Sequence, residues 1–226
     1  MQLILAEAAL GFYFAATLLA FFYLYRKDEK LSLWMMRLAG AGALLHLASF
    51  GVRLEQFWLI PENRYFLPIN SFFGALSYLS MAAALVFFVV EREHRLGILG
   101  AFVLPWSVIG LGTAVVYADP KVVGLVPDLQ SYWLNIHPMV LMTAYAVLGN
   151  AFGVGLALLV QENQLKSRKP SELCYRLPSI QDLDNLNSKL ILVALPVLVA
   201  GILMGCVWAY NAWGRFWGWD PKETWS

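Results

Sequence analysis

The sequence predicts an all-α protein, a polytopic membrane bundle of about six transmembrane helices. Hydrophobic residues make up 60% of the 226 residues and charged residues only 14%, whereas soluble domains average about 45–50% apolar and about 25% charged residues. A helix that spans the bilayer core needs about 20 apolar residues. Six stretches have this length, at residues 3–25, 32–52, 70–90, 96–117, 136–160 and 188–210.

Polar or proline-containing connections separate the first three spans. The N-terminus, MQLILAEAAL, lacks the positive n-region of a cleavable signal peptide, so the first span is predicted to be a retained helix. The sequence RKDEK follows it, a loop with proline at about 53–69 follows the second span, and EREHR follows the third. These breaks favour three separate helices.

The other three spans follow the same scheme. A loop near 118–135 precedes the fifth span, in which Gly149 and Gly153 form a GxxxG pair that favours close helix packing. A long polar connection at 161–187 leads to the sixth span. Neither a second domain nor a clear internal repeat is evident, so residues 1–226 are interpreted as a single transmembrane domain.

The orientation follows from the basic residues of the connections, because cytoplasmic loops are enriched in Lys and Arg. The odd connections and the entry to the sixth span carry ten Lys and Arg residues, and the even connections with the C-terminal segment carry five. We therefore expect the N-terminus and residues 211–226 to face outward and the 161–187 connection to be cytoplasmic.

Net charge and cysteine content exclude two classes of function. The net charge is +1 without a basic block, so nucleic acid is not an expected partner. Cys174 and Cys206 are far apart and form no CxxC pair, so neither a redox motif nor a disulfide framework is indicated.

The C-terminal stretch WGRFWGWDPKETWS holds four of the nine tryptophans, Trp213, Trp217, Trp219 and Trp225. One or two would fit the aromatic belt at a membrane surface, but four exceed what anchoring requires. Trp213 and Trp217 have i, i+4 spacing, which on a helix places them on one face. A flat apolar platform for a large planar ligand and an aromatic belt are both open interpretations.

Asp220-Pro221-Lys222-Glu223 predicts the start of a helix. Asp is a favoured N-cap, Pro a favoured first residue, and Glu three residues after the cap completes a capping-box pattern. Only a little more than one turn follows before Ser226, and such a helix is not stable alone. We therefore expect further helices after residue 226 in the complete protein.

The three histidines differ in their surroundings. His137 precedes Pro138, and a residue before proline is biased away from helical geometry, so we expect it at the entrance of the fifth span, on the same side as the tryptophans. It is a candidate ligand for iron or another metal; the alternative is an interfacial polar residue. His46 lies within the second span, where ionisable groups are candidate functional residues; its alternative is a neutral imidazole bonded to a neighbouring helix. His94 lies among charges, and a solvated face explains it.

Residues 176–226, which end in WGRFWGWDPKETWS, resemble the cytochrome c assembly proteins of biogenesis system II. These CcsA-type haem-handling membrane proteins carry a highly specific "WWD" motif. The segments HLASFGVRLEQFWLIPENRYFLPINSFFGALSYLS and SYWLNIHPMVLMTAYA show weaker similarity to the same family. The resemblance thus covers most of the chain.

The resemblance implies that haem b binds at the outer membrane face and is joined there to apocytochrome c. Cysteine thiols of a CxxCH segment in the apoprotein form thioether bonds with the haem vinyl groups, so the chain would be a subunit of a holocytochrome c synthase. Trp213, Trp217, Trp219 and Asp220 take the motif positions, and His137 takes that of an external axial ligand. Arg215 is a candidate partner of the propionates, with a solvated charge as the alternative, and His46 is a candidate iron ligand.

The resemblance also implies partners and a location. The expected partners are apocytochrome c, a second system II membrane subunit, thiol-reducing proteins and membrane lipid. The expected location is the bacterial inner membrane, with the WWD segment on the periplasmic face. In the family, a second external histidine follows the WWD segment, and residues 1–226 do not contain it.

Other functions remain open from the sequence. His137-Pro138 is also found in system I haem exporters, which are the related alternative. A small-molecule permease without haem would usually show repeats or intramembrane charges, and the spans here are nearly free of carboxylates apart from Glu7. A purely structural scaffold would tolerate loss of Trp217 and Trp219.

Overall fold

The computed structural model describes residues 1–226 except 27, 95–96, 127–129, 168 and 225–226. The described part is all-α and contains no strand. Its elements are α1 (Gln2–Arg26), α2 (Glu29–Trp58), the 3-10 helix η1 (Pro61–Asn63), α3 (Phe72–His94), α4 (Gly100–Tyr117), α5 (Tyr132–Lys166), α6 (Glu172–Arg176), α7 (Ile180–Trp213) and α8 (Pro221–Thr224). Six of these helices are long and apolar enough to cross a membrane. The predicted fold class, a polytopic helical membrane bundle, is confirmed.

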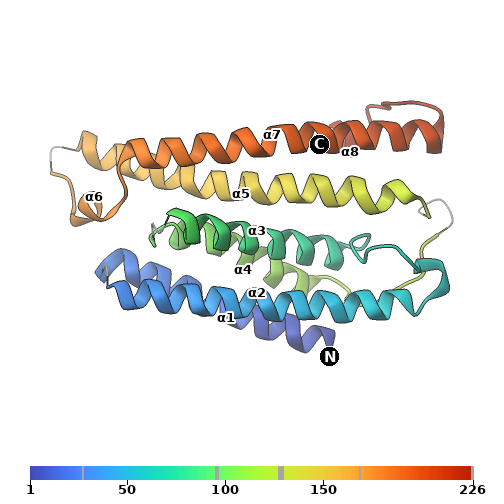
Figure 1. The fold of residues 1–226 in the computed structure, drawn as a ribbon, viewed down its shortest axis with the longest axis horizontal. Coiled ribbons are helices and arrows are strands. Elements are labelled where there is room, and N and C mark those ends of the chain that lie inside the picture. Colours follow the sequence, from blue (N-terminus) through green and yellow to red (C-terminus); the bar gives the residue numbers. More distant parts are fainter. Residues whose placement is uncertain (27, 95–96, 127–129, 168, 225–226) are drawn as a thin grey trace.

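The six long helices run alternately up and down the bundle (Figure 1). α1 packs mainly on α2, α3 on α4, and α5 on α7. The N-terminus, the end of α2, the start of α5 and the end of α7 therefore lie at one end of the molecule, called here the N-terminal end. This arrangement brings the segment with His137 to the same end as the described part of the Trp-rich segment (residues 211–224).

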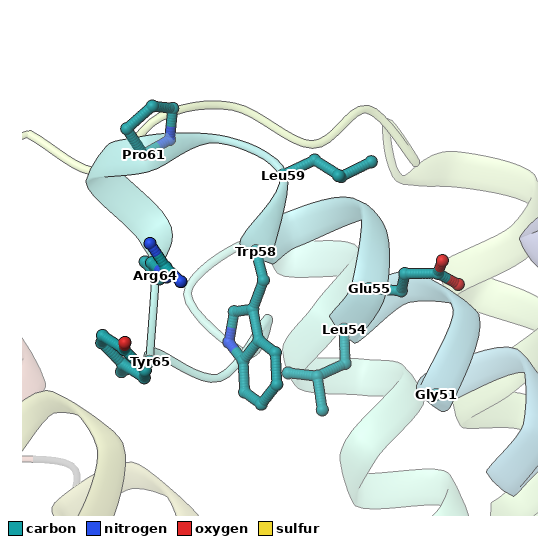
Figure 2. Close-up of a pocket in the computed structure, with 8 residues that line it drawn as sticks. All are labelled: Gly51, Leu54, Glu55, Trp58, Leu59, Pro61, Arg64 and Tyr65. Carbon is teal, nitrogen blue, oxygen red and sulfur yellow. The ribbon is translucent and has the colours of Figure 1, made fainter.

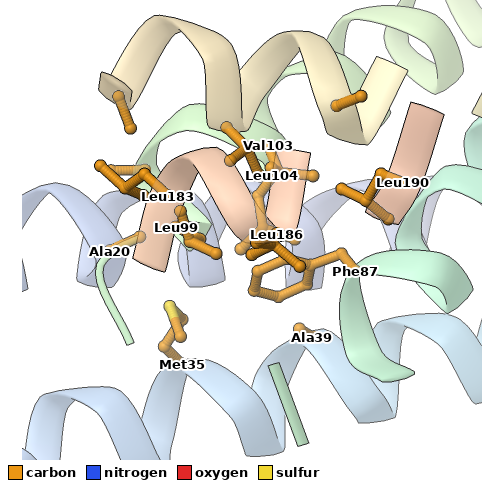
Figure 3. Close-up of a cluster of buried hydrophobic side chains, with 14 of the residues drawn as sticks. Ala20, Met35, Ala39, Phe87, Leu99, Val103, Leu104, Leu183, Leu186 and Leu190 are labelled. Atoms are coloured by element: carbon orange, nitrogen blue, oxygen red, sulfur yellow. The ribbon is translucent and has the colours of Figure 1, made fainter. Parts of the chain in front are cut away.

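A buried apolar cluster joins helices from all parts of the chain (Figure 3). Small residues such as Ala20 and Ala39 sit beside larger ones such as Met35 and Phe87. Leu183 and Leu186 bring the first turns of α7 into the same cluster. Small side chains let helices approach closely, which matters in a membrane because lipid is as apolar as the helices themselves.

Three helices are longer than the apolar stretches that predicted them. α2 continues to Trp58, α5 runs from Tyr132 to Lys166, and α7 begins at Ile180. The start of α7 is capped by Ser179, whose hydroxyl accepts a hydrogen bond from the Asp182 N–H at 3.1 Å. The connection drawn from composition at 161–187 is thus mostly helical, because helix formation depends on caps and propensity and does not stop where the residues become polar.

Candidate functional site

A pocket of about 250 Å³ lies at the N-terminal end, between α5, the last turns of α7 and the folded-back Trp-rich segment. We call it the aromatic pocket. Its lining residues are His137, Leu141, Ile202, Gly205, Cys206, Trp208, Ala209, Trp213, Phe216, Trp217, Asp220 and Glu223. One histidine, two carboxylates and four large aromatic rings therefore share a single site.

His137 lies inside a helix, and the expectation that it stands at a helix entrance is wrong. α5 begins at Tyr132, so His137 and Pro138 fall in its first two turns. Proline lacks the N–H that an interior helical position needs, yet membrane helices tolerate it where neighbouring groups satisfy the freed backbone. The helical position turns the imidazole of His137 toward α7.

A backbone carbonyl of α7 fixes the His137 ring. The Nδ1 atom lies 2.8 Å from the Gly201 carbonyl oxygen. A carbonyl can only accept a hydrogen bond, so Nδ1 donates its proton and, in the neutral ring, Nε2 keeps a lone pair. This is the arrangement that orients metal-binding histidines in proteins, with one nitrogen held by a hydrogen bond and the other available as a ligand.

Glycine at position 205 makes room for this ring. A Cβ atom there would lie 2.5 Å from Cε1 and 3.1 Å from Nε2 of His137. Gly201, one turn earlier, allows a similar approach by Leu141, whose Cδ2 would lie 2.7 Å from an added Cβ. The Gly201–Gly205 pair is therefore the close contact that seats His137 against α7.

The tryptophans meet at the pocket without sharing one helical face. α7 ends at Trp213, and Gly214 forms its C-cap in a left-handed conformation (φ 71°), so Trp217 lies beyond the helix that carries Trp213. The i, i+4 interpretation therefore does not hold, because glycine ended the helix between them. Trp208 and Trp213 contact edge to face with ring centroids 4.8 Å apart.

The predicted helix start at Pro221 is confirmed. The Glu223 N–H donates to Oδ1 of Asp220 at 2.9 Å, and the Asp220 N–H lies 3.4 Å from Oε2 of Glu223. These are the two reciprocal bonds of a capping box. The short α8 helix thus closes the Trp-rich segment back on itself, beside the pocket.

The remaining predicted residues of this segment are more exposed. Trp213 is 53% exposed and Trp219 is 79% exposed. The Arg215 guanidinium lies against the backbone of Gly218, where an added Cβ would be 2.5 Å from its Cζ. Arg215 has no ion pair among the described residues, so its charge is free to meet an anionic group. Trp225 lies outside the described residues.

His46 is completely buried on α2, away from the aromatic pocket. Its Nε2 lies 2.9 Å from the Ser77 hydroxyl of α3, and its Nδ1 lies 3.4 Å from the Tyr13 hydroxyl of α1. Both ring nitrogens therefore contact side chains of neighbouring helices. This geometry favours the alternative in which His46 is a neutral imidazole that joins helices.

A larger hollow of about 790 Å³ lies nearby at the N-terminal end (Figure 2). Its walls include Trp58 and Tyr65, with the Trp58 indole donating to the Phe66 carbonyl at 2.8 Å. Asn135 of α5 ties this loop to the His137 helix, since its side chain donates to the Tyr65 carbonyl at 2.9 Å. The loop after α2 thus braces the first turn of α5.

Sequence reasoning missed the glycines that seat the histidine. The predicted GxxxG pair makes a close helix contact at Gly153, where an added Cβ would lie 2.8 Å from the Phe102 carbonyl oxygen, whereas nothing lies within 4 Å of an added Cβ at Gly149. The sequence GILMG at 201–205 has the same spacing and could have been found by the same search. Cys206 also went unassigned, because a lone cysteine in a span gives no signal of a pocket.

The fold and the pocket define the class of protein: an integral membrane bundle with an aromatic pocket that contains one available imidazole. Among the described residues, no three His, Cys, Asp or Glu side chains converge to hold a metal ion by themselves.

Comparison with known proteins agrees with this class. The cytochrome c assembly protein family matches residues 69–226, and the chain belongs to this family. Its relatives include the protein NrfI of Wolinella succinogenes, which is 34% identical over 167 residues, covering 70% of this chain and 17% of that protein. The cytochrome c biogenesis proteins CcsA of Heterosigma akashiwo and Guillardia theta are 30% and 32% identical over 73% of this chain, and the alignments cover 62% and 60% of those proteins. The chain thus spans about three fifths of these CcsA relatives.

Proposed function

We propose that this protein binds haem b in the aromatic pocket at the outer membrane face and presents it for covalent attachment to apocytochrome c. Membership of the cytochrome c assembly family supports a role in cytochrome c biogenesis. The observation that carries the haem site is the His137–Gly201 hydrogen bond, which holds the ring and leaves Nε2 as a ligand in an aromatic pocket.

The residues present fit a porphyrin edge. The pocket volume of about 250 Å³ is below the range of about 300–1,000 Å³ for sites that enclose a whole drug-sized ligand, so the site takes one edge and leaves the rest accessible. Trp213 and Trp217 line this pocket and Trp219 contacts Trp217, and aromatic rings bury large planar area at low entropic cost. Nε2 of His137 would hold the haem iron, and Arg215 would be available to a propionate.

An exposed haem edge is what the attachment reaction requires. Haem supplies two vinyl groups, and each cysteine thiol of the apoprotein adds across one of them. An S–H bond and a C=C π bond are broken while a C–S and a C–H bond are formed, with no net oxidation. The residues of this chain orient and hold the substrate, while the bond-forming groups belong to haem and apocytochrome c. The chain then acts as a subunit of a holocytochrome c synthase.

The orientation and the partners belong to the same proposal. The excess of Lys and Arg in the odd connections favours the N-terminal end as the periplasmic end in a bacterial inner membrane. Apocytochrome c and thiol-reducing proteins would then meet the pocket from that side, together with a second system II membrane subunit. A haem exporter of the system I type is the second candidate, because His137 is followed by proline.

Haem titration of the purified chain in nanodiscs tests the proposal. We expect wild type to give a Soret band of imidazole-ligated haem, and His137→Ala to lose this spectrum and regain it with free imidazole. His94→Ala is the matched control, since His94 lies at the other end of the bundle, and it should bind like wild type. Absence of haem binding by wild type, or equal spectra for wild type and His137→Ala, would rule out this site.

A further inference from the structure

Trp219 has an unusual backbone conformation. Its φ is 57°, and Tyr65 is the other non-glycine residue with positive φ in the described part of the chain. A bulky residue in this region is uncommon, and such backbone strain persists only where the surroundings enforce it. Some contact must therefore hold Trp219 in place.

Glu223 makes the contacts on both sides of Trp219. Its Oε2 atom accepts hydrogen bonds from the backbone N–H groups of Gly218 and Asp220, the two residues that flank Trp219. The Glu223 N–H in turn donates to the Asp220 carboxylate at 2.9 Å. One carboxylate oxygen thus closes the loop around the strained residue.

The consequence of this loop is the placement of an aromatic ring. Trp219 is 79% exposed, and its ring meets that of Trp217 edge to face, with centroids 6.0 Å apart and planes at 86°. Relaxation of Trp219 to an extended backbone would swing the ring away from Trp217. Trp217 lines the aromatic pocket, so the Trp219 ring would no longer extend the aromatic surface beside it.

An ordinary capping role does not explain all of the contacts that Glu223 makes. A capping box needs the bond to the N-cap residue, which is Asp220, but the bond to Gly218 reaches beyond the helix to the far side of Trp219. α8 is only four residues long, so capping this helix does not account for the additional hydrogen bond to Gly218 in the preceding loop. The hydrogen bonds of Glu223 to Gly218 and Asp220 therefore stabilise the conformation of the loop around Trp219.

We propose that Glu223 is a positioning residue of the aromatic pocket: it holds Trp219 in its left-handed conformation, so that the Trp219 ring extends the pocket wall at Trp217 toward a planar ligand. The ligand class, a porphyrin, rests on the proposed function. The clamp itself is a property of the loop and can be measured without any ligand.

The test compares Glu223→Ala with Glu223→Gln in the full chain. Glutamine keeps one carbonyl-type oxygen that can accept from Gly218 and Asp220, whereas alanine removes the acceptor. Glu162→Ala is the matched control, because Glu162 is a carboxylate paired with Lys166 at the opposite end of α5. Amide hydrogen exchange over 214–224 measures the clamp, and haem titration in nanodiscs measures the pocket.

We expect Glu223→Ala to lose amide protection at Gly218 and Asp220 and to bind haem about tenfold more weakly, a change of about 1.4 kcal/mol. Glu223→Gln should keep both protection and affinity within about twofold of wild type, and so should Glu162→Ala. This rescue would not occur if the negative charge of Glu223 were what the ligand needs.

Two results would overturn the proposal. The first is unchanged haem affinity in Glu223→Ala while wild type binds haem. The second is a loss of affinity in Glu223→Gln although the two amides stay protected, which would assign the effect to charge. If wild type binds no haem, the proposed function fails and the pocket role of Glu223 fails with it, whereas the exchange data still show separately whether the clamp exists.

Discussion

The imidazole of His137 rests directly on the backbone of Gly205, with no space for a Cβ between them. An added Cβ would lie 2.5 Å from Cε1 and 3.0 Å from Nδ1 of the ring, distances that real Cβ atoms do not sustain. The ring is also tied to Gly201 by its hydrogen bond, so it cannot move aside without losing that bond. The two helices α5 and α7 thus meet through a histidine on one and two glycines on the other.

Gly205→Ala tests this contact. We expect the ring to be displaced, the Gly201 bond to weaken and haem affinity to fall about tenfold or more, while the helix content stays the same because alanine favours helix. Haem titration and circular dichroism measure the two effects.

Gly149→Ala is the control for that variant. Nothing lies within 4 Å of a Cβ at Gly149, so the change should leave haem affinity unaltered and stabilise α5 by up to about 1 kcal/mol. Equal haem affinities in Gly205→Ala and wild type would contradict the seating of His137 on α7.

His46 is predicted to stabilise the bundle through Ser77 of α3, with which it shares a hydrogen bond at 2.9 Å. A double-mutant cycle of His46→Ala and Ser77→Ala should give a coupling energy of about 0.6–1.7 kcal/mol, the scale of hydrogen bonds between membrane helices. Thermal unfolding in detergent measures it. Both variants should keep the haem spectrum of wild type; a spectrum altered by His46→Ala alone would instead support its role as an iron ligand.

Arg53 is predicted to organise the loops of the N-terminal end. It is buried on α2 and donates to the Pro120 carbonyl at 2.9 Å and the Ser71 hydroxyl at 3.0 Å, with its guanidinium 4.8 Å from the centre of the Phe73 ring. Arg53→Lys keeps the charge but loses the planar fork. We expect a loss of about 1–3 kcal/mol, the scale of charged hydrogen bonds, and faster amide exchange near residues 119–124. Stability equal to that of wild type would show that a single ammonium group suffices.

Arg215 is predicted to contribute to haem affinity through charge. It is exposed and lacks an ion-pair partner in the part of the chain that the structure describes, so a propionate would form an exposed pair with it. Such pairs contribute about 0.2–1 kcal/mol, and Arg215→Gln should therefore weaken haem binding about two- to fivefold at low salt. The difference should shrink as salt rises, because exposed charges are screened.

Lys121→Gln is the control for Arg215→Gln, since Lys121 is another exposed cation of the loops at the N-terminal end and does not line the aromatic pocket. It should bind haem like wild type. Equal losses of haem affinity in both variants would show that the overall positive charge of this end, and not Arg215 itself, attracts haem. Unchanged affinity in Arg215→Gln would show that Arg215 is only a solvated charge.

The helices and the capping box could be predicted because their signals are local. Apolar runs of about 20 residues mark the spans, and Asp220 and Glu223 mark the start of α8 across three residues. The helix limits were predicted less well. His137 was placed outside the helix by a rule about its neighbour Pro138, and the packing of α5 on α7 overrode that preference.

The sequence by itself therefore determined the class of fold, the Trp-rich segment and the candidate histidine. Only the tertiary structure decided how these meet: the Nδ1 of His137 on a carbonyl 64 residues away, the glycine beneath the ring, and the turn at Gly214 that separates Trp213 from Trp217. The physical reason is the distance along the chain over which each interaction acts. Hydrophobicity and caps act within a few turns of chain, whereas the orientation of an imidazole depends on which backbone atoms of a distant helix come within hydrogen-bond distance.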